Sequence, residues 1–98
     1  MIISFKHKWL RDFFIDDKNH KKIPADIDSR LFRKLQLIDD AVADLDLRVP
    51  PSNHFEKLLG NLKDRHSIRI NKQWRLIFYW NSSNGEASDI YLDNHDYH

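Results

Sequence analysis

Hydrophobic and polar residues alternate from Ser67 to Trp80, and this pattern predicts two β-strands joined by a tight turn at Asn71-Lys72, where Asn tolerates positive φ. Successive side chains on a strand point to opposite faces. The core-facing residues are expected to be Ile68, Ile70, Trp74, Leu76, Phe78 and Trp80. The opposite face carries Arg69, Asn71, Arg75, Ile77 and Tyr79. We therefore expect an open cationic face, which suits a phosphate backbone.

Hydrophobic spacing predicts two helices before this hairpin. A short amphipathic helix is expected from Lys8 to Ile15. A longer helix is expected from Pro24 to about Ala43. Its apolar residues recur every three or four positions, at Ile27, Leu31, Leu35, Ile38 and Val42, with Leu45 beyond. Its opposite face is charged, with Arg30, Arg33, Lys34, Asp39, Asp40 and Asp44. We expect the longer helix to cover the hairpin and close the core.

The remaining segments complete an α+β fold. Residues 2–5 form a plausible first strand, with Ile3 and Phe5 on one face. After a turn at residues 82–85, residues 87–93 alternate, with Ile90 and Leu92 inward, and predict a third strand of an antiparallel sheet. Residues 47–53 contain two prolines and are expected to be an extended link, while residues 55–65 show no clear pattern. A chain of 98 residues predicts one domain, residues 1–98.

Composition narrows the function classes. The chain has no cysteine, which excludes disulfide frameworks and thiolate catalysis. No apolar run approaches the roughly 20 residues that span a bilayer, and the N-terminus shows no secretory signal, so we expect a cytoplasmic protein without a membrane partner. Residues 55–80 carry six Lys or Arg against two acidic residues, whereas residues 81–98 carry four acidic residues and no Lys or Arg. This basic region favours an anionic partner, although a highly charged chain also forms such clusters by chance.

Residue types and their spacing favour neither a metal site nor a protein nucleophile. His95 and His98 with Asp93 and Asp96 resemble a metal-ligand set, but without helical spacing or cysteine they do not favour a metal or any other cofactor. Asp64, His66 and Ser67 lack the context of a nucleophile elbow. Gly60 and Gly85 are the only glycines, so no phosphate-cradling loop is expected.

Arg75 and the C-terminal Asp96-Tyr97-His98 offer a chemistry without metal. Arg75 lies in mid-strand, where it either lies flat over Tyr79 or Ile77 or serves a site. His98 is suited to general acid or base catalysis near neutral pH. Arginines would stabilise a phosphorane-like transition state. Together these groups describe RNA cleavage in which the 2′-OH attacks the adjacent phosphate.

Five segments carry a resemblance to a known family. They are RKLQLIDDA, DLRVPPSN, FEKLLG, SIRINKQWRLIFYW and the terminal DYH. The chain resembles the HigB-type toxins of the RelE/ParE superfamily. The resemblance implies a small RelE-like microbial ribonuclease fold, with two N-terminal helices packed on an antiparallel sheet. It implies a metal-independent, ribosome-dependent endoribonuclease that cuts mRNA. It also implies a HigA-type helix-turn-helix antitoxin, through which alone the toxin would associate with operator DNA.

The resemblance assigns roles by position. Arg75 would stabilise the scissile phosphate, and His98 would transfer protons. Asp96 would orient His98, and Tyr97 would stack or form a hydrogen bond. Where some relatives have a histidine and a lysine, this chain has Glu56 and Lys57, with His54 nearby, so the general base is open. Arg69 or Asn71 would fill the second basic position. The further residues expected to contact RNA are Lys63, Arg65, Lys72, Gln73 and Tyr79.

Two other functions remain open on the sequence alone. A ParE-like gyrase inhibitor would share the fold without using the terminal motif. A non-catalytic module that binds RNA or the antitoxin would show salt-sensitive RNA binding without cleavage.

Overall fold

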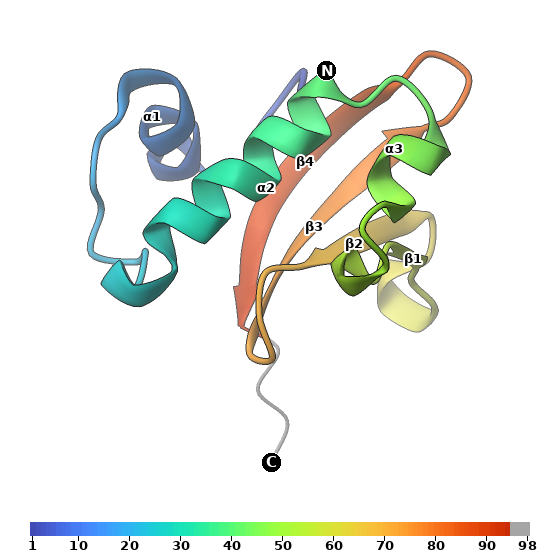
Figure 1. Cartoon of the computed structure of the whole chain (residues 1–98). Helices are drawn as coiled ribbons and strands as arrows, with labels where there is room; N and C mark the ends of the chain where they lie inside the picture. Colours follow the sequence, from blue (N-terminus) through green and yellow to red (C-terminus); the bar gives the residue numbers. More distant parts are fainter. Residues whose placement is uncertain (95–98) are drawn as a thin grey trace.

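The computed structural model, which describes residues 1–94, places helices against one face of a four-stranded antiparallel sheet (Figure 1). The strands are β1 (Glu56–Lys57), β2 (Arg65–Arg69), β3 (Trp74–Asn81) and β4 (Glu86–Asn94), in the order β1-β2-β3-β4. The helices are α1 (Lys8–Asp16), α2 (Asp28–Asp40) and α3 (Asp44–Arg48). Short 3-10 turns lie at Ala25–Ile27, Pro51–Asn53 and Gly60–Leu62. The predicted α+β fold with two N-terminal helices on an antiparallel sheet is confirmed.

One hydrophobic cluster joins α2 to the inner face of the sheet. Its members from α2 and the strands include Leu31, Leu35, Ile38, Ile68, Leu76, Phe78 and Ile90. The predicted core face of the hairpin is confirmed, with Trp74 half-buried at its end. Helix α1 adds Leu10 and Phe13, and Phe32 of α2 meets the rings of Phe13 and Phe14 at centroid distances of 6.3 and 5.4 Å. No helix within residues 1–94 is long and apolar enough to cross a membrane.

Helix α2 ends at Asp40, three residues earlier than its hydrophobic spacing predicts. The backbone turns extended at Ala41, and the Asp46 carboxylate accepts hydrogen bonds from the amides of Val42 and Ala43 at 2.9 and 3.2 Å. This capping begins α3 instead of continuing α2. Val42 and Leu45 are consequently 74% and 68% exposed, so their predicted place on the apolar face is wrong.

Residues 2–5 do not form a regular strand. They run parallel to β4 through isolated bridges from Ile2 to Ala87 and from Phe5 to Ile90. The two bridges are three residues apart on both segments, and Asp89, between the partners in β4, adopts a positive φ of 53° within the register shift between β3 and β4. Ile2 and Phe5 pack against the core whereas Ile3 is exposed, so the prediction that Ile3 and Phe5 share one face is wrong.

The segment between α2 and the hairpin is more structured than predicted. Leu47 is buried within α3 rather than in an extended link. Asn53 is fully buried, and its side-chain amide donates to the carbonyls of Leu47 and Val49 at 3.2 Å each. The stretch predicted to be irregular contains β1, in which Glu56 lies opposite Ser67 of β2. These elements hold residues 54–57 against the edge of the sheet.

Candidate functional site

The hairpin between β2 and β3 brings two arginines together at its turn. Arg69 and Arg75 are the last directly opposed pair, and the Ile70 amide donates to the Trp74 carbonyl at 2.9 Å. Asn71 does not adopt the expected positive φ. Its side-chain oxygen instead accepts from the amides of Gln73 and Trp74, at 2.8 and 2.7 Å, which closes the turn.

A small hollow of about 50 Å³ lies beside this turn, and we call it the hairpin hollow. It is lined by His54, Glu56, Ser67, Arg69, Asn71, Lys72, Trp74 and Arg75. Six of these residues were predicted as site residues, whereas Ser67 and Trp74 were not. Glu56 reaches the hollow because it pairs with Ser67, two residues before Arg69 and therefore on the same face.

Arg75 is held by an acidic residue of the neighbouring strand. Its Nε donates to the Asp93 carboxylate at 3.1 Å, and the two residues are directly opposed in the β3–β4 register. The side chains are only 15% and 32% exposed. The Arg75 head group is thus directed to Asp93 on the neighbouring strand. A guanidinium has five N–H donors, so this contact orients Arg75 and leaves donors for an anion.

Arg69 and Lys72 differ from Arg75 because neither forms an ion pair with an acidic residue of the described chain, residues 1–94. Both side chains are exposed. The outer face is not polar throughout, however, because Ile77 is fully buried between Ser67 and Tyr91 in the register. The buried Ile77 thus interrupts the cationic face between the hairpin end and Arg65.

Other predicted site residues lie away from the hollow. Arg65 and Tyr79 are paired four residues along the hairpin, about 13 Å from the Arg69 pair at strand spacing. The Arg65 guanidinium stacks over Tyr79 at 4.6 Å and lies 3.7 Å from the Asp89 carboxylate. The outer cationic face therefore divides into two separate ends.

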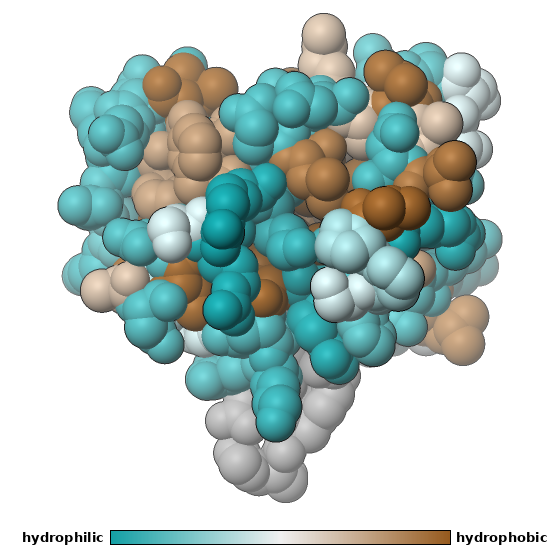
Figure 2. All heavy atoms as spheres, viewed as in Figure 1, coloured by the Kyte–Doolittle hydropathy of each residue, from teal (hydrophilic) through white to brown (hydrophobic). Residues whose placement is uncertain are grey.

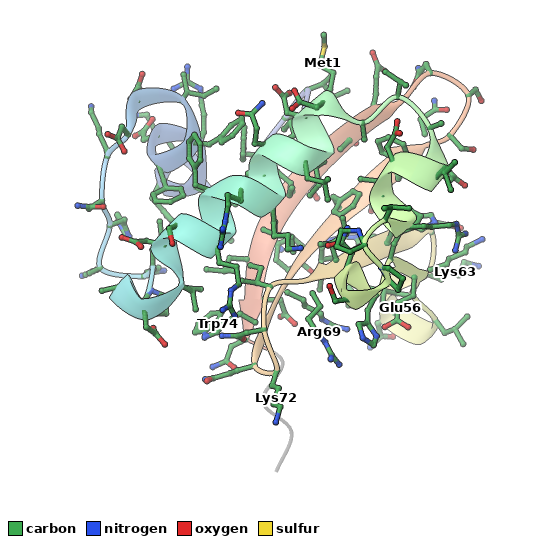
Figure 3. The ribbon with its side chains drawn as sticks, viewed as in Figure 1. Met1, Glu56, Lys63, Arg69, Lys72 and Trp74 are labelled. Atoms are coloured by element: carbon green, nitrogen blue, oxygen red, sulfur yellow. The ribbon has the colours of Figure 1, made fainter. Side chains whose placement is uncertain are left out.

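Lys57, Lys63 and Gln73 also fall outside the lining of the hairpin hollow. Lys57 follows Glu56 on the strand and therefore points to the opposite face, in register with His66. Lys63 is exposed after the Gly60–Leu62 turn, apart from Arg69 and Lys72 (Figure 3). Gln73 is exposed within the hairpin turn.

The predicted terminal residues Asp96, Tyr97 and His98 lie outside the described residues, as does His95. Strand β4 ends at Asn94, directly opposite Trp74. The described chain thus ends beside the residue that precedes Arg75. Within residues 1–94, no three or more His, Cys, Asp or Glu residues are grouped to hold a metal ion.

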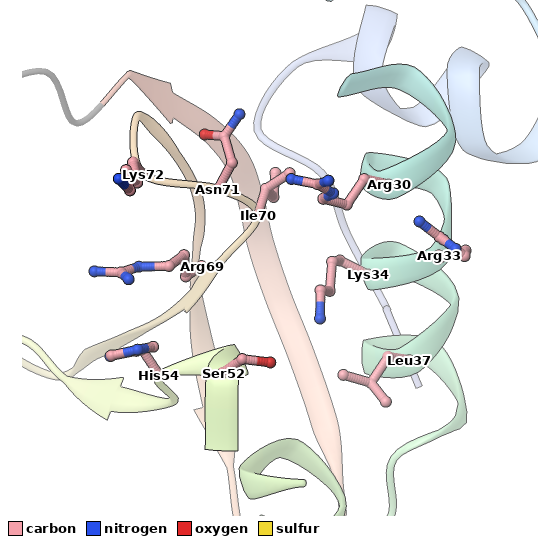
Figure 4. Close-up of a pocket in the computed structure, with 10 residues that line it drawn as sticks. All are labelled: Arg30, Arg33, Lys34, Leu37, Ser52, His54, Arg69, Ile70, Asn71 and Lys72. Atoms are coloured by element: carbon pink, nitrogen blue, oxygen red, sulfur yellow. The ribbon is translucent and has the colours of Figure 1, made fainter. Parts of the chain in front are cut away.

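A larger groove of about 640 Å³ runs between α2 and the hairpin (Figure 4), and we call it the α2 groove. It is lined by Arg30, Arg33, Lys34, Leu37, Ser52, His54, Arg69, Ile70, Asn71 and Lys72. The groove and the hairpin hollow share four lining residues, so the two adjoin each other. The sequence pattern placed the three α2 cations on a solvated helix face, and they were missed as site residues. Their spacing of three and four positions was the available signal.

These features define a class of protein: a small RelE-like fold with a polar site at the end of its central hairpin. Residues 3–95 match the family described as RelE-like toxin of type II toxin-antitoxin system HigB. The chain therefore belongs to the HigB family of RelE-like toxins and is a toxin of a type II toxin–antitoxin system. The predicted family resemblance is confirmed.

Three individual proteins show how similar the chain is to known sequences and structures. The chain is 55% identical over 97 residues to Toxin HigB-1 of Vibrio cholerae, covering 99% of this chain and 100% of that protein. It is 40% identical over 93 residues to an uncharacterized protein of Haemophilus influenzae, covering 95% and 90% of the two chains. A solved YoeB-YefM complex from Staphylococcus aureus matches with a TM-score of 0.54 and 22% identity, covering 99% of this chain and 97% of that one. That likeness concerns the fold.

Proposed function

We propose that this toxin is an endoribonuclease that cuts mRNA on the ribosome without a metal ion and thereby inhibits translation. The observation that carries the proposal is the hairpin hollow, which combines Arg69 and Arg75 with Glu56 and His54. Two guanidinium groups beside a carboxylate and an imidazole supply both charge stabilisation and proton transfer for a phosphate diester.

The reaction needs no nucleophile from the protein. The 2′ oxygen of the substrate attacks the adjacent phosphorus as its proton passes to a general base. The bond from phosphorus to the 5′ oxygen breaks, and a general acid protonates that leaving oxygen. The products are a 2′,3′-cyclic phosphate and a 5′-hydroxyl end. Arg75 and Arg69 stabilise the negative charge that develops on the phosphoryl oxygens.

Proton transfer is assigned to residues from two parts of the chain. Glu56 and His54 are the candidate bases that line the hollow, with Lys57 as a further candidate on the same strand. His98 is proposed as the acid, oriented by Asp96, with Tyr97 stacking on a base. Four residues extend at most about 14 Å, so a chain that leaves β4 opposite Trp74 can reach the hollow.

The remaining predicted contacts are assigned to RNA binding and partners. Asn71, Lys72 and Gln73 lie at the hairpin turn, while Lys63, Arg65 and Tyr79 lie farther along the sheet. We assign both groups to contacts with ribosome-bound RNA. The ribosome would hold the 2′-OH in line with the leaving oxygen. A HigA-type helix-turn-helix antitoxin would neutralise the toxin, and only that complex would bind operator DNA.

Mapping of mRNA 5′ ends after brief expression tests the proposal. Wild-type toxin is expected to produce cuts at defined codon positions, and Arg75→Ala and His98→Ala are expected to abolish them. Arg11→Ala, an exposed arginine of α1 outside the hollow, serves as the matched control and should cut normally.

Each other outcome contradicts a defined part of the proposal. Cuts that persist without His98 would reject its role and direct attention to Glu56, His54 and Lys57. Retained toxicity with DNA damage and no mRNA cuts would favour a gyrase inhibitor. Salt-sensitive RNA binding without a cyclic phosphate product would favour a non-catalytic module.

A further inference from the structure

The α2 groove concentrates positive charge without any acidic residue to balance it. Its cations come from α2 and from the hairpin, and they are Arg30, Arg33, Lys34, Arg69 and Lys72. None of the five forms an ion pair with Asp or Glu within the chain up to Asn94, and no acidic residue lines the groove. Strongly hydrophilic side chains cover the front of α2 and the hairpin end (Figure 2). The groove therefore presents a site for an anion.

Lys34 is the fixed member of this set. Figure 4 shows its side chain extending from α2 into the space between the helix and the hairpin. Its ammonium donates to the Oδ1 atom of Asn53. Asn53 is itself fully buried and locked by its two bonds to backbone carbonyls. An ammonium has three donors, so two remain after this contact. Lys34 is thus pre-oriented within the groove.

Most charges near the ends of α2 are not arranged to stabilise the helix. The helix dipole favours acidic side chains near the N-terminus and basic ones near the C-terminus. The first residue of α2 is acidic and follows this rule, but Arg30 also lies in the first turn, and Asp39 and Asp40 lie in the last. Burial, and then the charges of Arg33 and Arg30, lower the pKa of Lys34. The repulsion among Lys34, Arg33 and Arg30 is not offset by an acidic partner within residues 1–94, and a bound phosphate would offset it.

The lining also indicates which part of a nucleic acid would bind. His54 is the one ring among its lining residues, which include no Phe, Tyr or Trp on which successive bases could stack. Leu37 and Ile70 are its apolar members, too few to bury the side chains of a docked polypeptide. Lys and Arg, which make up half of the lining, are the usual partners of phosphate oxygens. Arg69 lines both the groove and the hairpin hollow, so a strand bound in the groove would lie next to the hollow that holds Arg75.

We propose that the α2 groove binds backbone phosphates of the RNA strand whose neighbouring phosphate occupies the hairpin hollow, with Lys34 as the central contact and Arg30 and Arg33 beside it. This inference rests on the proposed ribonuclease function and identifies a substrate track for it.

Fluorescence anisotropy of purified toxin with a labelled twelve-nucleotide 2′-O-methyl RNA tests the inference. The methyl group blocks the nucleophile, so binding is measured without cleavage. Lys34→Met and the double variant Arg30→Gln/Arg33→Gln are each expected to raise Kd by about tenfold at low salt. The slope of log K against log salt should fall by about 0.7 for each phosphate that a variant no longer neutralises.

The matched control is Lys8→Gln/Lys18→Gln, which removes the same charge as the double variant from exposed positions outside the groove. We expect its Kd to stay within about twofold of wild type, because distant exposed charges are screened. An equal rise of Kd in this control would show that the weaker RNA binding of the double variant comes from its lower net charge and not from the groove. That result would overturn the inference. The double variant leaves the Lys34–Asn53 hydrogen bond intact, so it remains informative if Lys34→Met unfolds.

A second probe separates RNA from an acidic polypeptide. A labelled twelve-residue polyglutamate peptide that loses affinity in the α2 variants, while RNA does not, would assign the groove to an acidic protein segment and overturn the RNA proposal. Failure of the ribonuclease proposal is distinguishable, because wild-type toxin would then bind RNA in the groove but cut no mRNA.

Discussion

At the scale of single residues, the sequence indicated Arg75 but not what holds it. An arginine between Trp74 and Leu76 breaks the apolar pattern of the strand, and that alone marked it as a candidate. Its partner Asp93 was considered only as a residue of the predicted third strand and in a possible metal-ligand set. The pairing depends on the β3–β4 register, which shifts between Ile77 and Tyr79. Such a shift has no local sequence signature, so the ion pair could not be predicted.

His66 carries a prediction for pH dependence. Its ring stacks on Phe55 at 4.9 Å, and its Nδ1 is buried without a hydrogen-bond partner in the described structure. Burial lowers the pKa of His66 below 6.5, against the opposing charge of Asp44. The unfolded chain therefore binds more protons just below pH 6.5. The contribution of neutral His66 to the free energy of unfolding should be complete above pH 6.5. It should be lost progressively as the pH falls from 6.5 to the lower pKa that His66 has in the folded protein.

His66→Phe keeps the aromatic stack and removes the titrating group. We expect this variant to lose less free energy of unfolding between pH 8 and pH 5 than the wild type, measured by urea denaturation. The comparison at pH 8, where His66 is neutral in both states, isolates the packing effect. Equal losses in both proteins would show that His66 does not contribute to the pH dependence.

At the scale of elements, periodic hydrophobic patterns correctly predicted α1, the hairpin and β4. The connecting segments were not predicted correctly. Val42 and Leu45 continue the helical spacing of α2. The Asp46 carboxylate nevertheless accepts a hydrogen bond from the Val42 amide, so that α2 ends and α3 begins. Strand β1 was missed for a related reason, because a two-residue strand has no pattern of its own. As a result, Glu56 entered the candidate site through the family resemblance and not through its position on a strand.

The turn between β3 and β4 offers a matched pair of glycine substitutions. Gly85 has a φ of +69°, and a Cβ there would lie 2.8 Å from the Val42 carbonyl oxygen, between the turn and the α2–α3 connection. Gly60 has a similar φ of +70° with nothing within 4 Å. Gly60→Ala should cost about 1–2 kcal/mol from backbone strain alone. Gly85→Ala should cost roughly 1–3 kcal/mol more, because it also overpacks. Chemical denaturation of both variants gives the comparison, and equal costs would show that the close approach is relieved.

At the scale of the whole molecule, charge is separated between the ends of α2. The cations of its first half line the α2 groove together with those of the hairpin, while Asp39 and Asp40 lie at the far end. The sequence showed a basic segment from 55 to 80, but not that α2 extends it. Which face of α2 meets the hairpin is decided by tertiary packing, and a formal net charge of +1 conceals the result.

Cleavage of mRNA on purified ribosomes tests the central claim most directly. Ribosomes stalled on a defined mRNA would be mixed with wild-type toxin, Arg75→Gln or the control Arg11→Gln, and both RNA ends would be identified. We predict a 2′,3′-cyclic phosphate and a 5′-hydroxyl, with cleavage slowed by about 10²–10³-fold in Arg75→Gln and unchanged in the control. A 5′-phosphate end, an equal rate in Arg75→Gln, or intact mRNA with active wild-type toxin would contradict it.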